Sequence, residues 1–206
     1  DTRSKKQDFK ILDTSVLIDG RISDICRTGF IEGTILVPRF VLEELQYIAD
    51  STDTLRRNKG RRGFEMLEEM QNNPDIDFQI TEEDFQDIDD VDAKIIQLAK
   101  GIGAKVITND FNLNKVAELQ AITVLNINEL AESVKPMVVH GETMTVRVLK
   151  EGKEFNQGVA FLDDGTMVIV EDGKKYLGQT IEVVVNTVLA TDAGRMIFTR
   201  KKGDET

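Results

Sequence analysis

Four acidic side chains of this sequence stand where carboxylates could share a metal ion. Asp13 ends the run FKILD and Asp110 follows the run KVITN, so each comes at the end of a predicted strand. Glu44 falls within the helical pattern VLEELQYI, and Asp92 falls in the first turn of the helical pattern VDAKIIQLAK. Carboxylates repel one another, and a hard divalent cation that prefers oxygen ligands gives them a reason to converge.

Each of these acids also has a simpler explanation. An Asp that follows a strand is a good N-cap for the next helix, and an acid in a first helical turn is favoured by the helix dipole. Glu44 lies beside the apolar stripe of Val41, Leu45 and Ile48, whereas Glu43 points away from it. Glu44 is therefore the acid placed toward the interior, with access to solvent at the edge of the stripe as the alternative.

The residue types narrow the metal and its chemistry. The chain has one cysteine and one histidine, Cys26 and His140, which excludes an internal disulfide and argues against zinc. We expect His140 to be a surface residue. Mg²⁺ or Mn²⁺ held by Asp and Glu can activate a water molecule and stabilise the charge on a phosphate group during displacement.

Short apolar runs alternate with helical patterns up to about residue 133. The predicted strands are 9–13, 76–80, 105–109 and 122–126, and the predicted helices are one that opens at Pro38, 64–71, 91–102 and 114–120. This alternation predicts an α/β domain with a parallel sheet flanked by helices. In such sheets sites gather at the carboxyl ends of the strands, where Asp13 and Asp110 are expected.

The pattern changes after Pro136 to five short β-rich runs. Asp164-Gly165 and Asp172-Gly173 are typical hairpin dipeptides, whose glycine supplies a positive φ. Five strands in so short a segment predict a small antiparallel β-barrel. We therefore expect two domains, residues 1–135 and 136–206.

Charge is unevenly distributed along the chain. The net charge is −11, which argues against a protein that simply coats phosphates. The acidic block Glu82–Asp92 nevertheless shares the first domain with the basic block RRNKGRR at 56–62. No apolar run reaches the roughly 18 residues of a membrane span, and no signal-peptide pattern is present; we expect a cytoplasmic protein.

Three stretches together resemble the PIN-domain nucleases. LDTSVLIDG, VPRFVLEELQ and DAKIIQLAKGIGAKVITND, with the triplet Thr108-Asn109-Asp110, are similar to the PIN signature over about residues 8–133. The segment from GETMTVRVLK to GRMIFTRK resembles a TRAM domain, a small OB-like β-barrel associated with RNA binding. The order of the two resembles the bacterial YacL-type PIN/TRAM proteins.

The resemblance implies metal-binding and catalytic roles for Asp13, Glu44, Asp92 and Asp110. It also implies a hydroxyl at Thr108 near the metal, and one from Thr14 or Ser15 beside Asp13. Many PIN domains have a further acid shortly after the Thr-X-Asp triplet, where this chain has Asn112. The departure predicts weaker metal binding and a site for one metal ion rather than two.

The resemblance also implies partners. RNA is the expected ligand, with DNA as the alternative, and a homodimer or a higher homo-oligomer is expected because PIN domains often pair. Full-length members of the group carry transmembrane helices ahead of the PIN domain, so a segment upstream of Asp1 would hold the protein at the inner face of the membrane. The residues expected to bind nucleic acid are Arg56, Arg57, Lys59, Arg61, Arg62, Lys174 and Lys175.

Two features of the expected nucleic-acid surface have alternatives. Gly60 within the basic block suggests a mobile loop that fits a phosphate backbone, and a solvated helix face is the alternative. Aromatic residues of the second domain could stack on bases or could belong to its core. They are Phe155, Phe161, Tyr176 and Phe198.

Two functional hypotheses follow. The leading one is a divalent-metal-dependent ribonuclease, an endonuclease, whose TRAM domain holds the RNA. The other is a nucleic-acid-binding regulator with little or no nuclease activity, which Asn112 and the acidic net charge favour. A phosphatase with Asp13 as nucleophile fits poorly because Ser15 stands where a second Asp is needed, and a phosphorylated receiver domain fits poorly because the paired acids before Asp13 are missing.

Overall fold

The computed structural model describes residues 8–191 and 194–204. The chain divides into two compact units, Asp1–Val134 and Lys135–Thr206. Each unit has a hydrophobic core of its own. No helix of the described residues is both long and apolar enough to cross a membrane.

The first unit is built on a parallel sheet of five strands. The strands are β1 (Phe9–Leu12), β2 (Thr34–Pro38), β3 (Phe78–Thr81), β4 (Lys105–Ile107) and β5 (Val124–Leu125). Their order is β3-β2-β1-β4-β5, and every pairing is parallel. This confirms the predicted α/β class, and the alternation of apolar runs with helical patterns is its local cause.

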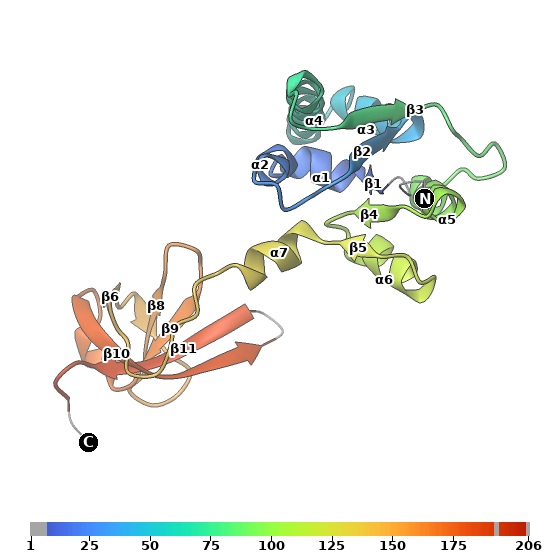
Figure 1. Cartoon of the computed structure of the whole chain (residues 1–206). Helices are drawn as coiled ribbons and strands as arrows, with labels where there is room; N and C mark the ends of the chain where they lie inside the picture. Colours follow the sequence, from blue (N-terminus) through green and yellow to red (C-terminus); the bar gives the residue numbers. More distant parts are fainter. Residues whose placement is uncertain (1–7, 192–193, 205–206) are drawn as a thin grey trace, which may run out of the picture. The chain divides into compact units, whose positions relative to one another are not determined.

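Helices cover both faces of this sheet. They are α1 (Thr14–Asp19), α2 (Ile22–Arg27), α3 (Arg39–Ala49), α4 (Thr54–Asn72), α5 (Val91–Ile102), α6 (Phe111–Leu119) and α7 (Ile127–Ser133). Figure 1 shows α1 to α4 on one face and α5 and α6 on the other. The predicted bounds of α5 are confirmed, whereas α1, α2 and α7 were not predicted because six or seven residues are too few for a clear period.

The order of the strands reverses between β1 and β4. The chain moves outward from β1 through β2 to β3, then crosses back to β4 on the other side of β1. The backbone N–H of Asp13 donates to the carbonyl of Ile107 at 3.1 Å, which ties the ends of the two strands together. Ligand sites of open α/β sheets form at such a reversal, outside the carboxyl ends of the strands.

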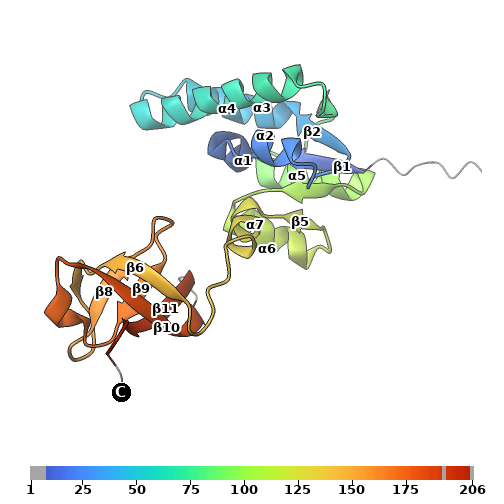
Figure 2. The same ribbon diagram turned by 60° about the vertical axis from the view of Figure 1, so that its left-hand side comes forward.

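The basic block RRNKGRR lies within α4, so the prediction of a mobile loop was wrong. Figure 2 shows α3 and α4 side by side as a helical pair. Gly60 is buried in their contact, where a Cβ would lie 2.6 Å from the Cα of Ala49, and a Cβ on Gly63 would lie 2.6 Å from a methyl carbon of Leu45. The glycine is required because the two backbones approach closely, not because the chain bends.

The second unit is a six-stranded sheet that curls into a barrel-like shape. The strands are β6 (Thr143–Arg147), β7 (Lys150–Glu151), β8 (Gly158–Phe161), β9 (Met167–Val170), β10 (Thr180–Thr191) and β11 (Gly194–Lys201). Their order is β6-β10-β11-β9-β8-β7. The two edge strands are separated by only Val148 and Leu149, so one continuous segment serves both edges of the sheet and curls it.

This sheet differs in detail from the predicted five antiparallel strands. The run ETMTVRVLK forms two strands rather than one, because it changes partner from β10 to β8. The sheet is mixed, because β9 and β11 pair in parallel. Sequence patterns do not reveal which strands pair.

Of the two predicted hairpin dipeptides, one forms a hairpin. Gly165 has φ of +85° in the turn between the antiparallel strands β8 and β9. Asp172-Gly173 is not a hairpin, since Gly173 begins the short 3-10 helix η1 (Gly173–Tyr176) and β9 does not pair with β10. Gly173 is needed there because a Cβ would lie 2.9 Å from the backbone nitrogen of Gly158.

Candidate active site

Asp13 is the most enclosed of the four predicted acids, with 4% of its surface exposed. It follows β1 and is the N-cap of α1. Its Oδ2 accepts hydrogen bonds from the hydroxyl of Ser15 at 2.5 Å and from the hydroxyl of Thr108 at 2.9 Å. Its Oδ1 has no hydrogen-bond partner among the described side chains, so one oxygen of a rigidly held carboxylate remains available.

Thr108 links Asp13 to Asp110. Its side chain is fully buried, its Oγ1 donates to Asp13, and the same atom accepts from the backbone N–H of Asp110 at 2.9 Å. Asp110 is the N-cap of α6, and its Oδ1 accepts from the backbone N–H groups of Asn112 and Leu113 at 2.7 and 2.9 Å. The capping explanation is therefore correct for Asp110, and it leaves the other carboxylate oxygen for a further ligand.

Glu44 lies on the side of α3 that faces α1. Its Oε2 accepts a hydrogen bond from the hydroxyl of Thr14, and the side chain is partly buried. Glu43 is exposed and lies 3.6 Å from the guanidinium of Arg39 on the same helix. The helix period thus separates two adjacent acids, of which one is near Asp13 and the other is on the surface.

Asp92 shows that the four carboxylates are electrostatic neighbours. Burial, together with the negative charges of Asp13, Asp90, Asp110 and Glu44, raises the pKa of Asp92 to about 6. Asp90 is the N-cap of α5, and its proximity follows from the sequence. The other three come from β1, β4 and α3, and they meet at the reversal in strand order.

The residues that converge here fit a divalent cation. They are all oxygen ligands, and none of the four forms an ion pair with a Lys, Arg or His of the described residues. Within residues 8–191 and 194–204, no group of three or more His, Cys, Asp or Glu side chains is arranged so that it could hold a metal ion by itself. Mg²⁺ commonly keeps several waters and uses one or two carboxylates, which suits an open cluster of this kind.

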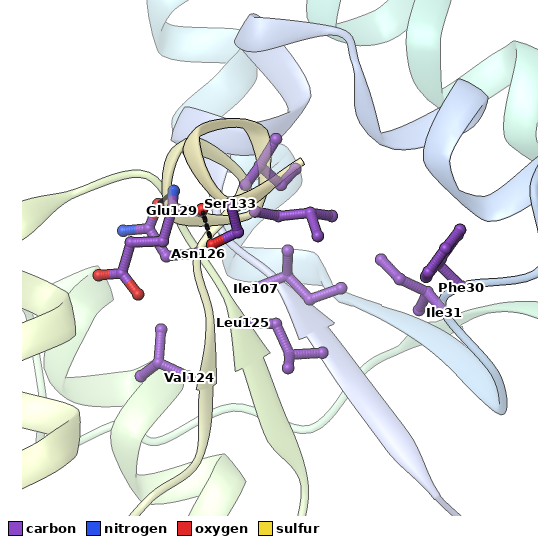
Figure 3. A pocket seen from close by; sticks show the side chains of 10 residues that line it. Phe30, Ile31, Ile107, Val124, Leu125, Asn126, Glu129 and Ser133 are labelled. Carbon is purple, nitrogen blue, oxygen red and sulfur yellow. Dashed lines mark hydrogen bonds between the residues drawn. The ribbon is translucent and has the colours of Figure 1, made fainter. Parts of the chain in front are cut away.

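Two hollows lie near the ends of these strands. Asp92 and Asn112 line one of about 350 Å³ between α5 and α6. A second hollow, of about 330 Å³, lies beside α7 and contains none of the four acids. Figure 3 shows its mainly apolar lining, which includes Ile107 and Leu125.

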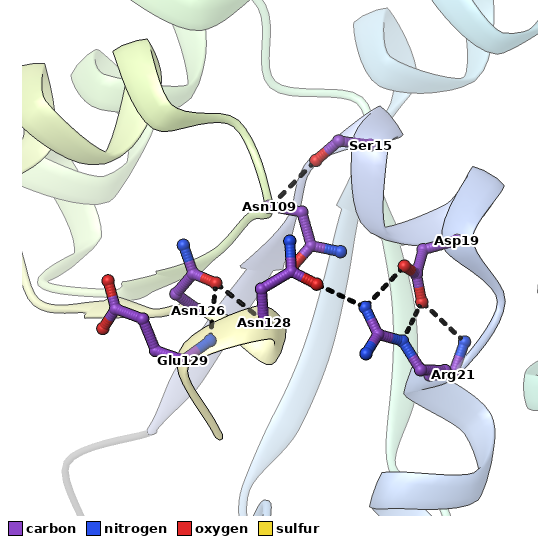
Figure 4. A network of polar contacts seen from close by, with 7 residues as sticks. All are labelled: Ser15, Asp19, Arg21, Asn109, Asn126, Asn128 and Glu129. Atoms are coloured by element: carbon purple, nitrogen blue, oxygen red, sulfur yellow. Dashed lines mark hydrogen bonds and ion pairs between the residues drawn. The ribbon is translucent and has the colours of Figure 1, made fainter. Parts of the chain in front are cut away.

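A polar network on the α7 side of the site was not predicted. Arg21 forms two bonds to Asp19, at 2.6 and 2.7 Å, and a third to Asn128 at 2.5 Å (Figure 4). These contacts with Arg21 lower the pKa of Asp19. The backbone N–H of Asn109 donates to the Ser15 hydroxyl at 3.1 Å, while its buried side-chain amide has no partner among the described residues. In the sequence, only the position of Asn109 inside the Thr-X-Asp triplet could have indicated that this residue belongs to the site.

The predicted nucleic-acid-binding cations differ in their surroundings. On α4, Arg56, Lys59, Arg61 and Arg62 are exposed, and Arg57 is partly buried with a guanidinium nitrogen 3.5 Å from the Ser51 carbonyl. A Cβ on Gly20 would lie 3.1 Å from Nε of Arg62, so Arg62 is in contact with the end of α1. In the second unit Lys174 lies 3.1 Å from Glu151 and Lys175 lies 3.4 Å from Asp204, so both lysines are paired with acids.

Comparison with known proteins agrees with this architecture. The family model of the PIN domain matches residues 10–119. The chain is 61% identical to the PIN and TRAM-domain containing protein YacL of Bacillus subtilis, over 94% of this chain and 53% of that protein. It is 47% identical to a PIN and TRAM-domain containing protein of Synechocystis, over 93% of this chain and 53% of that protein.

A third relative comes from Thermus thermophilus. This PIN and TRAM-domain containing protein is 44% identical over 93% of this chain and 56% of its own length. The chain thus spans about half the length of the curated relatives it matches. It belongs to the PIN domain family and has the PIN and TRAM organisation of these relatives.

Proposed function

We propose that this protein is a divalent-metal-dependent ribonuclease that hydrolyses phosphodiester bonds at the carboxyl ends of β1 and β4. The observation that carries the proposal is the meeting of Asp13, Glu44, Asp92 and Asp110, since the raised pKa of Asp92 has the charges of the other three among its causes. Carboxylates that repel one another destabilise a fold unless a bound cation offsets the repulsion, and such clusters are typical of functional sites. The PIN family, whose domains are nuclease-type, supports the same conclusion.

The chain supplies the ligands and holds them in place. A bound Mg²⁺ or Mn²⁺ provides an activated water and offsets charge on the phosphate. Asp13 is oriented by the hydroxyls of Ser15 and Thr108, which leaves Oδ1 for the cation. Glu44 is oriented by the Thr14 hydroxyl. The exposed cations of α4, with Arg62 at the end of α1, are the groups that would bind the RNA backbone.

Cleavage assays test this proposal directly. Single-stranded RNA is incubated with Mn²⁺ and either the wild type, Asp13→Asn or Asp110→Asn. We expect both variants to lose most activity, on the order of 100-fold or more, because each removes a charged ligand. Asp87→Asn is the matched control, because Asp87 is an exposed acid of the segment between β3 and α5. Equal cleavage by all four proteins would refute the assignment.

A nucleic-acid-binding regulator is the second candidate. The observation that favours it is Asn112, which lines the hollow beside Asp92 at a position where a charged ligand would strengthen metal binding. Asn112→Asp restores that charge. If the wild type binds RNA in a salt-dependent manner without metal-dependent turnover, and Asn112→Asp gains turnover, the regulator is the better description.

A further inference from the structure

The sheet of the second unit has two apolar faces, although only one of them faces its core. The core side chains come from alternate positions of the strands, and among them are Ala160, Val168 and Ile197. Residues on either side of these positions point outward because side chains alternate across a strand. On an ordinary barrel these outward positions would be polar.

Here the outward positions of four adjacent strands are mostly apolar. Strand register places them in two rows, Val159, Ile169, Phe198 and Thr187 in the first and Phe161, Met167, Met196 and Leu189 in the second. Phe161 and Leu189 are 39% and 48% exposed. Val159 and Ile169 are buried, although they lie outside the core of the unit. We call these two rows the outer apolar face.

A hollow of about 390 Å³ lies on this face. It is lined by apolar side chains of the face, among them Met167, Met196 and Phe198, and by the segment 150–154 with Gln157. Pockets that hold small organic groups have volumes of roughly 300–1,000 Å³. Apolar walls with an aromatic ring and a polar rim are the surroundings in which an unstacked base is bound.

The charges at the rim favour a polyanion. Lys150 lies over the ring of Phe161, at 5.5 Å from its centroid, and neither Lys150 nor Lys153 forms an ion pair within the described part of the chain. Of the two acids of the rim, Glu151 is paired with Lys174 at 3.1 Å. Glu154 is hydrogen-bonded to Gln157 and is the rim acid that opposes an anion.

We propose that the outer apolar face is a base-binding site for a single-stranded polynucleotide. One base enters the hollow beside Phe198, a neighbouring base stacks on Phe161, and the flanking phosphates are contacted by Lys150 and Lys153. The proposal deepens the proposed function, because it assigns RNA binding in the second unit to this face rather than to the paired lysines Lys174 and Lys175.

Binding in EDTA tests the site apart from cleavage. The probes are fluorescein-labelled 12-nucleotide single strands of RNA and DNA and an abasic strand of equal length, measured with the full chain by fluorescence anisotropy. We expect Phe161→Ala and Phe198→Ala to weaken RNA binding by about fivefold or more each and to leave the abasic strand unaffected, because stacking on aromatic rings is what they remove. If the same variants weaken DNA binding as much as RNA binding, the site accepts single strands of either kind. If the DNA strand does not bind at all, the site is specific for RNA.

Charge variants separate base binding from phosphate binding. Lys150→Gln and Lys153→Gln should weaken binding of the abasic strand too, and each should lower the slope of log affinity against log salt by about 0.7. Glu154→Gln should strengthen binding. Lys202→Gln, which removes a lysine paired with Glu182, is the matched control and should change neither slope nor affinity.

Three outcomes would overturn the inference. They are an abasic strand that binds as tightly as RNA, unchanged binding by Phe161→Ala together with both lysine variants, and self-association of the chain that Phe161→Ala abolishes. Because Phe198→Ala could unfold the unit, its circular dichroism is compared with that of the wild type. The variants of Phe161, Lys150 and Lys153 provide the test without it.

Mn²⁺-dependent cleavage with no effect of these variants on binding would refute this site alone. Base-dependent binding by a chain that does not cleave would refute the nuclease alone.

Discussion

Replacing Asp92 with Asn should stabilise the protein at neutral pH while it abolishes metal-dependent cleavage. In the folded state burial and the neighbouring carboxylates raise the pKa of Asp92 from 3.8 to about 6. Between these two values the folded state retains a proton that the unfolded state has lost, so the free energy of unfolding falls as the pH rises through this window. Above pH 6 the ionised carboxylate is a net cost to the fold.

The magnitude follows from the same values. The difference between about 6 and 3.8 corresponds to about 3 kcal/mol at about 1.36 kcal/mol for each pKa unit. Asp92 is only partly buried, and screening by water reduces this to about 1–2 kcal/mol. An increase of that size raises the melting temperature of the first unit by roughly 3–8 °C.

The assay is thermal unfolding in EDTA at pH 7.5 and at pH 3.5. We expect Asp92→Asn to melt above the wild type at pH 7.5 and close to it at pH 3.5, where Asp92 is protonated in the folded state and mostly protonated in the unfolded state. Asp87→Asn is the control, because it removes the same charge from an exposed position. Added Mn²⁺ should stabilise the wild type more than Asp92→Asn, because a ligand that binds only the folded state raises its stability.

A variant that is less stable than the wild type at pH 7.5 in EDTA would refute this reasoning. That result would mean that Asp92 makes a favourable contact as an anion, and that the four carboxylates do not repel one another. Stabilisation of equal size by Asp87→Asn would refute it as well, since the effect would then belong to net charge alone.

Three further experiments have expected outcomes. Thr108→Val should lower stability by about 1–3 kcal/mol, measured by urea unfolding, because it removes a buried hydroxyl that contacts Asp13, and Thr108→Ser should restore most of the loss; equal losses in both variants would contradict this. Gly60→Ala should destabilise the fold because its methyl group meets the α3 backbone, whereas Gly101→Ala, where nothing lies within 4 Å, should stabilise it by about 0.5–1 kcal/mol; the opposite order would be incompatible with the helix contact. Burial raises the pKa of the Cys26 thiol to about 11, so alkylation of the folded chain at pH 8 should be much slower than that of the unfolded chain, and equal rates would contradict it.

The local elements of the first unit could be read from the sequence. Strand-end acids follow from apolar runs that stop at a polar residue, and α5 was predicted with its bounds because its apolar period is regular over twelve residues. The distinction between Glu43 and Glu44 also follows from the helix period alone. The short helices α1 and α2 were not predicted, because six residues each are too few to show a helical period.

Contacts between distant segments required the tertiary structure. The buried place of Gly60 depends on the approach of α3, and the division of one predicted strand into β6 and β7 depends on a change of partner. The outer apolar face depends on the parallel register of β9 with β11, two strands that are not adjacent in the chain. Such pairings are set by packing over the whole unit, and the local pattern of apolar residues does not predict them.

By itself, the sequence determined which residue types are present, where the longer apolar strands and the regular helix α5 form, and which carboxylates lie at strand ends. Only the tertiary structure decided that Asp13, Glu44, Asp92 and Asp110 are neighbours. The order β3-β2-β1-β4-β5 places β4 beside β1 although 92 residues separate Leu12 from Lys105, and this brings α3 and α5 together above the same strand ends. The physical reason is that the repulsion between two charges depends on the distance between them in space. For acids on different strands and helices, that distance is set only when the chain packs.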